Sequence, residues 1–375
     1  MALNLRSPII INNADSSTAY ATLAISIWNG EDNATVTAQY NIRKTASGLF
    51  LNFEISELIR DYLDITFDGN YNGQAVWVKF VHTVYNSANQ IILGPSQSVQ
   101  LAVDGYYYFE EAQTATPSLL ISNRELFVLE DNTFRIPIYA LRNPTVVFYK
   151  DGEVIASETI GSSTLSSGQI KYISIYGDDV NYDTFQERVT DANGTFEDNY
   201  CIQSFLNTYS IGAVDKITVS DSNGIETIKV NVIEECKYEP KKVTFINKFG
   251  ALQDMYFFKK AVENLTIKKE SYKSNIALNY GGYNSTTHVN RDFNVIGNES
   301  ISLSSGYLSE EYNEVFKQLL LSEKVWITNI LETGEQVLPI NVKTSELTYK
   351  TSLNNKLVEY TIGFDNSFDV INNIR

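Results

Sequence analysis

Short β-prone runs, separated at close intervals by turn residues, fill most of this 375-residue chain. YATLAISIW (20–28), for example, alternates apolar and small residues and ends at the turn cluster NGEDN. Aromatic and β-branched side chains suit a pleated, half-buried surface, and the chain contains 24 Tyr and 19 Phe. Asp151-Gly152 and Asn223-Gly224 each lie between two apolar runs, which is the strongest short-range signal for a β-hairpin. The pattern predicts a mainly β protein built from β-sandwich-like modules in series.

Changes in composition divide the chain, which is too long for one ordinary core, into three predicted domains. We expect an N-terminal β-sandwich domain over residues 1–112, a second β domain with a long polar loop over 113–236, and a C-terminal β domain over 237–375. AQTATPSL (112–119) is the expected linker after the first domain, because it is small and polar and contains Pro117. The polar loop is YGDDVNYDTFQERVTDANGTFEDN, between the two hairpins of the second domain.

One amphipathic helix is predicted within the C-terminal domain, over about 309–324 (SEEYNEVFKQLLLSEK). Its apolar residues follow the spacing i, i+3, i+4, i+7, i+8 of a single helical face. They are Tyr312, Val315, Phe316, Leu319 and Leu320. Ser309 is the expected N-cap, and Ser56 is expected to cap a shorter helix in SELIRDYL (56–63).

The charge balance limits the classes of partner. The chain has 45 acidic and 29 basic residues, a net charge of −16. Such a field repels phosphate, so we expect no nucleic-acid partner and no membrane partner. The N-terminal MALNLRSPIIINN has an apolar run too short for a signal peptide or a membrane span, which predicts a soluble protein made in a cytoplasm.

Few residues suggest chemistry. His82 and His288 are the only histidines, and we expect an exposed strand position for the first and a loop position for the second. GxSxG, Walker A and GxGxxG motifs are absent from the sequence. The acid-rich segments DDVNYD (178–183) and DANGTFEDN (191–199) lack the spacing of an EF-hand. These observations predict a protein that is not an enzyme and has no catalytic residues, cofactor or metal. The many carboxylates leave a glycan-cleaving enzyme as the least favoured alternative.

Cys201 and Cys236 are the only cysteines. Two cysteines without a CxxC spacing suggest neither a disulfide scaffold nor a zinc site. We expect buried free thiols, with one disulfide between them as the alternative.

The most unusual stretch is KKVTFINKFGALQDMYFFKKA (241–261). The segment from Lys241 to Lys273 contains eight lysines and three acidic residues, which gives it a net charge of +5 in an otherwise acidic chain. Aromatic residues interleave with the lysines, as on a platform for single-stranded nucleic acid, but the stretch lacks arginine and any RNA-binding consensus. Strands kept soluble by their lysines are another reading. We favour assembly, in which these lysines and aromatics face another subunit, and the predicted contact residues are Lys241, Lys242, Lys248, Phe249, Lys259 and Lys260.

Three parts of the sequence resemble virion structural proteins of tailed bacteriophages, especially those that infect Bacteroidota and marine bacteria. These parts are VTFINKFGALQDMYFFKK with the preceding ECKYEP, the C-terminal VLPINVKTSELTYKTSLNNKLVEYTIGFDNSFDVINNIR, and the N-terminal SPIIINN, AYATLAISIWNG, ISELIRDYLD, VWVKFV and DGYYYFEE.

The resemblance implies a non-enzymatic building block of a phage tail, at the baseplate or distal tail. Such a subunit would assemble in the host cytoplasm, into or onto a symmetric ring, with copies of itself and other virion tail proteins as partners. The alternative is a receptor-recognition tail protein that binds a host-surface glycan through its Tyr-rich loops.

Overall fold

The computed structural model describes residues 2–13, 15–29, 36–47, 50–71, 74–111, 114–129, 133–160, 170–176, 214–233, 237–275, 277, 281–331, 334–348 and 357–371. Within these residues the protein is mainly β and contains several sheets, which confirms the predicted fold class. The acid-rich segments at 178–183 and 191–199, together with Cys201 and Cys236, lie outside the described residues.

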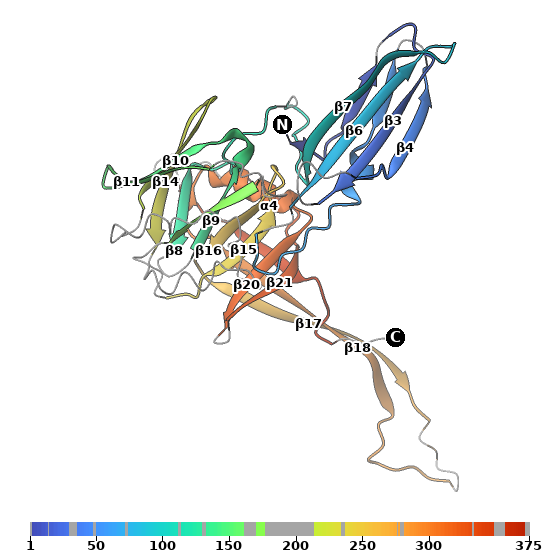
Figure 1. Ribbon diagram of the computed structural model, residues 1–375. Coiled ribbons are helices and arrows are strands. Elements are labelled where there is room, and N and C mark those ends of the chain that lie inside the picture. Colours follow the sequence, from blue (N-terminus) through green and yellow to red (C-terminus); the bar gives the residue numbers. More distant parts are fainter. Residues whose placement is uncertain are drawn as a thin grey trace.

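The N-terminal part consists of a five-stranded sheet packed against a two-stranded sheet and a short helix (Figure 1). The large sheet has the strand order β1-β7-β6-β3-β4, and β2 pairs with β5 in the small one. Between the layers lies a hydrophobic cluster that includes Leu23, Ile25, Phe53 and Ile59. The elements are β1 (Leu3–Asn4), β2 (Ile10–Asn13), β3 (Tyr20–Trp28), β4 (Tyr40–Thr45), β5 (Leu51–Glu54), α1 (Ser56–Arg60), β6 (Ala75–Tyr85) and β7 (Ile91–Val103).

The middle part has a five-stranded sheet of order β11-β10-β13-β14-β8 and a two-stranded sheet formed by β12 and β9. In the larger sheet β14 and β8 are parallel, and the other neighbours are antiparallel. The elements are β8 (Glu125–Leu129), β9 (Thr133–Tyr139), the 3₁₀ turn η1 (Ala140–Arg142), β10 (Thr145–Lys150), β11 (Glu153–Thr159), β12 (Ile170–Tyr176), β13 (Lys216–Asp221) and β14 (Gly224–Ile233).

The C-terminal part is a seven-stranded antiparallel sheet of order β16-β15-β20-β21-β23-β18-β17, with one helix. The hairpin of β17 and β18 extends away from the rest of the molecule (Figure 1). The elements are β15 (Lys241–Ile246), β16 (Leu252–Phe257), β17 (Ala261–Lys273), β18 (Asn290–Ser304), β19 (Leu308–Ser309), α4 (Tyr312–Leu321), β20 (Val325–Leu331), β21 (Gly334–Val342), β22 (Leu357–Val358) and β23 (Thr361–Asn366).

Both predicted hairpins of the middle part are present. β10 and β11 turn at Asp151 and Gly152, whose positive φ values of 51° and 85° match the backbone twist of a tight two-residue hairpin turn. β13 and β14 also pair, but Asp221 lies opposite Gly224, so this turn is one residue earlier than the Asn-Gly dipeptide implies. The Asp221 side chain accepts a hydrogen bond of 2.7 Å from the backbone N–H of Asn223, which stabilises the shifted turn.

The predicted C-terminal helix is present, but α4 covers only Tyr312–Leu321. Its buried apolar residues belong to the predicted stripe: Tyr312, Val315, Phe316 and Leu319. The expected cap by Ser309 is wrong, because the backbone of Ser309 pairs with Leu357 in a short strand and Glu311 occupies the N-cap position.

The cap expected from Ser56 is wrong in the same way. Ile55 is the N-cap of α1, and Ser56 is the first residue of the helix. The Ser56 hydroxyl hydrogen-bonds the carboxylate of Glu54 instead.

One large hydrophobic cluster is shared by the middle and C-terminal parts. It includes Leu126 and Val219 from the middle part, Phe245 and Phe364 from the seven-stranded sheet, and Phe316 from α4. Each of these side chains is at most 2% exposed. Because burial of apolar surface is the main favourable term in folding, the two parts stabilise each other.

Two smaller clusters join the N-terminal part to the other two. One contains Trp28 and Trp77 from the large sheet with Leu120 from the chain that follows it. The other contains Phe67 from the segment before β6 and Trp326 from β20. The described residues of the predicted linker end in this junction, where Ser118 and Leu119 are buried.

Candidate interaction surfaces

The basic stretch forms the hairpin of β15 and β16, and most of its aromatic side chains point into the protein. Phe245, Tyr256, Phe257 and Phe258 are each at most 4% exposed. The prediction that these aromatics face another subunit is therefore wrong for these four. The physical reason is that β16 is buried along its whole length, with hydrophobic clusters on both faces of the hairpin.

The turn between β15 and β16 places Lys248 and Phe249 against the N-terminal part. The carbonyl of Lys248 accepts a hydrogen bond of 2.8 Å from the backbone N–H of Tyr106. Its ammonium lies 3.1 Å from a carboxylate oxygen of Glu111. Phe249 is half-buried and packs against the cluster that contains Trp28 and Trp77. Both residues thus contact other parts of their own chain, and their role toward another subunit stays a prediction.

The other four predicted contact lysines lie together at the opposite end of this hairpin, because β15 and β16 are antiparallel. Lys241 is paired with Glu239 at 2.9 Å, and its side chain is 14% exposed. Lys242 and Lys259 are half-buried, whereas Lys260 is exposed. Lys260 directly precedes β17, so these lysines stand at the base of the projecting hairpin.

That hairpin, residues 261–304, is called the arm below. Every residue of β17 after Ala261 is exposed. Since β17 is also the edge strand of its sheet, one row of its backbone N–H and C=O groups faces away from β18. Large apolar side chains are exposed along the arm: Val262, Leu265, Ile267, Tyr272, Tyr283, Val289, Phe293 and Val295.

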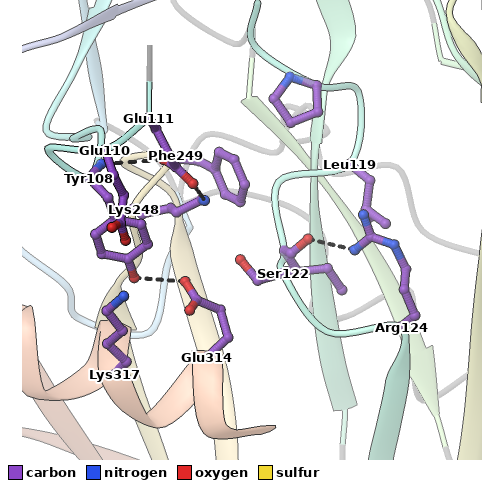
Figure 2. A pocket seen from close by; sticks show the side chains of 12 residues that line it. Tyr108, Glu110, Glu111, Leu119, Ser122, Arg124, Lys248, Phe249, Glu314 and Lys317 are labelled. Carbon is purple, nitrogen blue, oxygen red and sulfur yellow. Dashed lines mark hydrogen bonds and ion pairs between the residues drawn. The ribbon is translucent and has the colours of Figure 1, made fainter. Parts of the chain in front are cut away.

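A polar pocket of about 480 Å³ lies where the three parts meet, beside Lys248 and α4 (Figure 2). Most of its charged side chains interact with one another or with the chain around them. Besides the pair of Lys248 with Glu111, the Tyr108 hydroxyl donates a hydrogen bond of 2.7 Å to Glu314, and the Lys317 ammonium lies 3.5 Å from the centre of the Tyr108 ring. Burial, with this hydrogen bond as the next cause, raises the pKa of Tyr108. The arrangement braces α4 against the end of the N-terminal part.

A buried polar cluster joins the segment before β6 to β15 and β16. The Tyr71 hydroxyl lies 2.6 and 2.8 Å from the two carboxylate oxygens of Asp254, which also accepts a hydrogen bond of 2.7 Å from Thr244. The Arg135 guanidinium lies over the Tyr71 ring, 4.3 Å from its centre. Burial first, and then the Asp254 carboxylate, raise the pKa of Tyr71 well above its usual value. The geometry supports a structural role, because the carboxylate is enclosed by donors from the same chain.

The two histidines lie in different surroundings. His82 lies on β6 and is half-buried rather than exposed, with its ring 6.0 Å from that of Phe53. Burial lowers the pKa of His82. His288 is exposed and precedes β18, as expected for a loop position.

Across the described parts of the chain, no group of three or more His, Cys, Asp and Glu side chains is arranged to hold a metal ion. Within the same residues, no helix has the length and apolar character needed to cross a membrane. Comparison with protein-family models gives no match, and neither does comparison with curated proteins.

Proposed function

We propose that this chain is a non-enzymatic structural subunit of a bacteriophage tail, at the baseplate or distal tail. It assembles in the host cytoplasm with copies of itself and other tail proteins, into or onto a symmetric ring, and it remains in the virion. The resemblance of its N-terminal, central and C-terminal segments to virion structural proteins supports the assignment to a tail.

The arm is the observation that carries the proposal of an assembling subunit. A two-stranded ribbon is at best marginally stable in water, and exposed apolar patches in folded proteins mark interaction sites. In the arm, Leu265 and Ile267 are 56% and 58% exposed on an edge strand. A protein that works as a monomer gains nothing from leaving such a strand uncovered, whereas a subunit of an assembly buries it against a neighbour.

Light scattering and negative-stain imaging of the purified chain test the proposal. We expect one discrete oligomer and closed rings of identical subunits. Antibody labelling of intact phage particles that encode the chain is expected at the distal end of the tail.

Two results would replace this proposal. A chain that stays monomeric at high concentration and binds host-surface polysaccharide would favour the receptor-recognition alternative. Release of reducing sugar, lost when one carboxylate is mutated to its amide, would identify a glycan-cleaving enzyme.

A further inference from the structure

One face of the arm continues a face that packs on the hydrophobic core nearer the body. In β17 and β18, Ala261 lies opposite Leu303, which is 1% exposed and belongs to the large core cluster. Because side chains alternate along a strand, Leu265 and Ile267 lie on the same face as Ala261. This face, here called the inner face, passes beyond the core and leaves both side chains exposed.

The C-terminal segment adds apolar surface to the inner face. The N–H of Val370 donates a hydrogen bond of 2.9 Å to the carbonyl of Gly297 on β18. A Cβ atom built on Gly297 would lie 3.4 Å from Leu265 Cδ1 and 3.4 Å from Val370 Cβ, so the two side chains flank this glycine. Val370 is 50% exposed. Leu265, Ile267 and Val370 therefore form one exposed apolar patch at the base of the arm.

Charge distinguishes the outer half of the arm from the body. The outer half, from Lys268 to Asp292, contains four basic and two acidic residues. Its net charge is +2, which leaves −18 on the rest of the chain. Two such outer halves repel each other, whereas the outer half of one copy attracts the body of another. The arm extends away from its own body, so the body that it can contact belongs to a second molecule (Figure 1).

An exposed acidic segment of the body complements this charge. Residues 54–68 carry five acidic side chains against Arg60, which gives a net charge of −4. The acidic residues, all exposed, are Glu54, Glu57, Asp61, Asp64 and Asp68.

We infer that the arm docks on the body of a second copy of this chain. The apolar patch packs on the neighbour, and the outer lysines Lys269 and Lys273 lie against its acidic segment 54–68. The contact joins two different surfaces, so repetition of it generates a ring if the rotation between copies closes. This inference rests on the proposed function and deepens it, since it identifies the residues that join one subunit to the next.

A matched pair of double variants tests the apolar contact. Leu265→Asp with Ile267→Asp places charges in the patch. We expect the association constant measured by sedimentation equilibrium to fall by about tenfold or more. Asn264→Asp with Thr266→Asp adds the same charge to exposed positions on the opposite face of the same strand, and we expect association close to that of the wild type. Since all four side chains are exposed, each variant should fold, which circular dichroism checks.

A charge exchange tests the acceptor. Lys269→Glu with Lys273→Glu should weaken association, most strongly at low salt. Adding Glu57→Lys, Asp61→Lys and Asp64→Lys to the same chain should restore it, because segment 54–68 then carries a net charge of +2 and the outer half of the arm a net charge of −2. A combined variant that fails to re-associate would overturn the contact with segment 54–68.

The two proposals fail in different ways. A wild-type ring that is unchanged by the Leu265 and Ile267 variants overturns the docking of the arm and leaves the structural subunit intact. A wild-type chain that stays monomeric at its highest soluble concentration overturns both.

Discussion

At the residue scale, the hydrogen bond from the Tyr71 hydroxyl to the Asp254 carboxylate offsets the free-energy cost of burying that carboxylate. Tyr71 is 4% exposed and Asp254 is 2% exposed, so removal of the hydroxyl leaves a buried carboxyl group with one donor fewer. We expect Tyr71→Phe to lower the free energy of unfolding by about 1.5–3 kcal/mol, measured by urea denaturation.

The control for this variant is Tyr283→Phe, because Tyr283 is 73% exposed. It should change stability by less than about 0.5 kcal/mol. Equal effects of the two substitutions would show that the buried hydroxyl does not stabilise the junction.

His82 makes stability depend on pH in a defined direction. Burial lowers its pKa in the folded protein below the value of about 6.5 expected in the unfolded chain. As pH falls through that value, the unfolded chain binds the proton before the folded one does, and the folded state loses stability. His82→Leu should therefore show a smaller loss of thermal stability than the wild type between about pH 7 and pH 5.

The exposed His288 provides the comparison for this pH dependence. His288→Leu should leave the slope of melting temperature against pH as it is in the wild type. An unchanged slope in His82→Leu would exclude His82 as its source.

How far single residues could be predicted from the sequence depended on whether the signal was local. The Asp151-Gly152 turn was predictable, because the backbone conformation is set by the two residues themselves. The burial of Phe245 and Phe257 was not, because it depends on the middle part and α4 covering the sheet, which are distant in sequence. A mostly apolar run such as VTFI (243–246), which only Thr244 interrupts, is nevertheless typical of a strand buried on both faces, and that signal could have located the core here.

At the element scale, the turn between β15 and β16 fixes how the N-terminal part meets the C-terminal sheet. Gly250 has a φ of +75°, and a Cβ atom there would lie 2.7 Å from Val103 Cβ and 2.9 Å from the backbone nitrogen of Gly105. Gly152 has a similar φ of +85° but nothing within 4 Å of such an atom. Alanine at Gly152 therefore tests the cost of the backbone conformation alone, whereas alanine at Gly250 tests that cost together with the cost of a steric clash.

This comparison gives a prediction. Gly152→Ala should cost roughly 1–2 kcal/mol from the left-handed backbone alone. Gly250→Ala should lower the free energy of unfolding in urea by a further ~1–3 kcal/mol, because the methyl group also displaces Val103 or the backbone near Gly105. Equal losses of stability in the two variants would mean that the residues around Gly250 move to accept a methyl group without a free-energy cost.

Predicted elements were most accurate where periodicity was strong. The buried face of α4 matches the predicted stripe, but the ends of the helix do not match, because strand pairing of Ser309 with Leu357 takes the residue expected as its cap. The arm was recognised only as a basic stretch, because sequence alone does not show that a strand pair leaves the body.

At the scale of the whole molecule, the large core cluster sets how the chain unfolds. It contains residues from both sides of the predicted boundary at 236–237, such as Leu126 and Phe316. The N-terminal part has its own cluster, to which Leu23 belongs. Residues that share a core lose their protection together when that core opens. The strands and the helix that line this cluster should therefore behave as one cooperative unit, distinct from the N-terminal sandwich.

Hydrogen exchange of two core variants tests this. Phe316→Ala removes a fully buried ring from α4 and should cost about 3–5 kcal/mol. We expect faster amide exchange both in β8 and β14 and in β15 and β23, because all of them enclose the same cluster. Leu23→Ala should speed exchange in β3 and β6, whereas exchange in β8, β14, β15 and β23 should stay as slow as in the wild type. If Phe316→Ala accelerates exchange only after residue 237, the predicted boundary there separates two folding units, and the shared cluster does not make them cooperative.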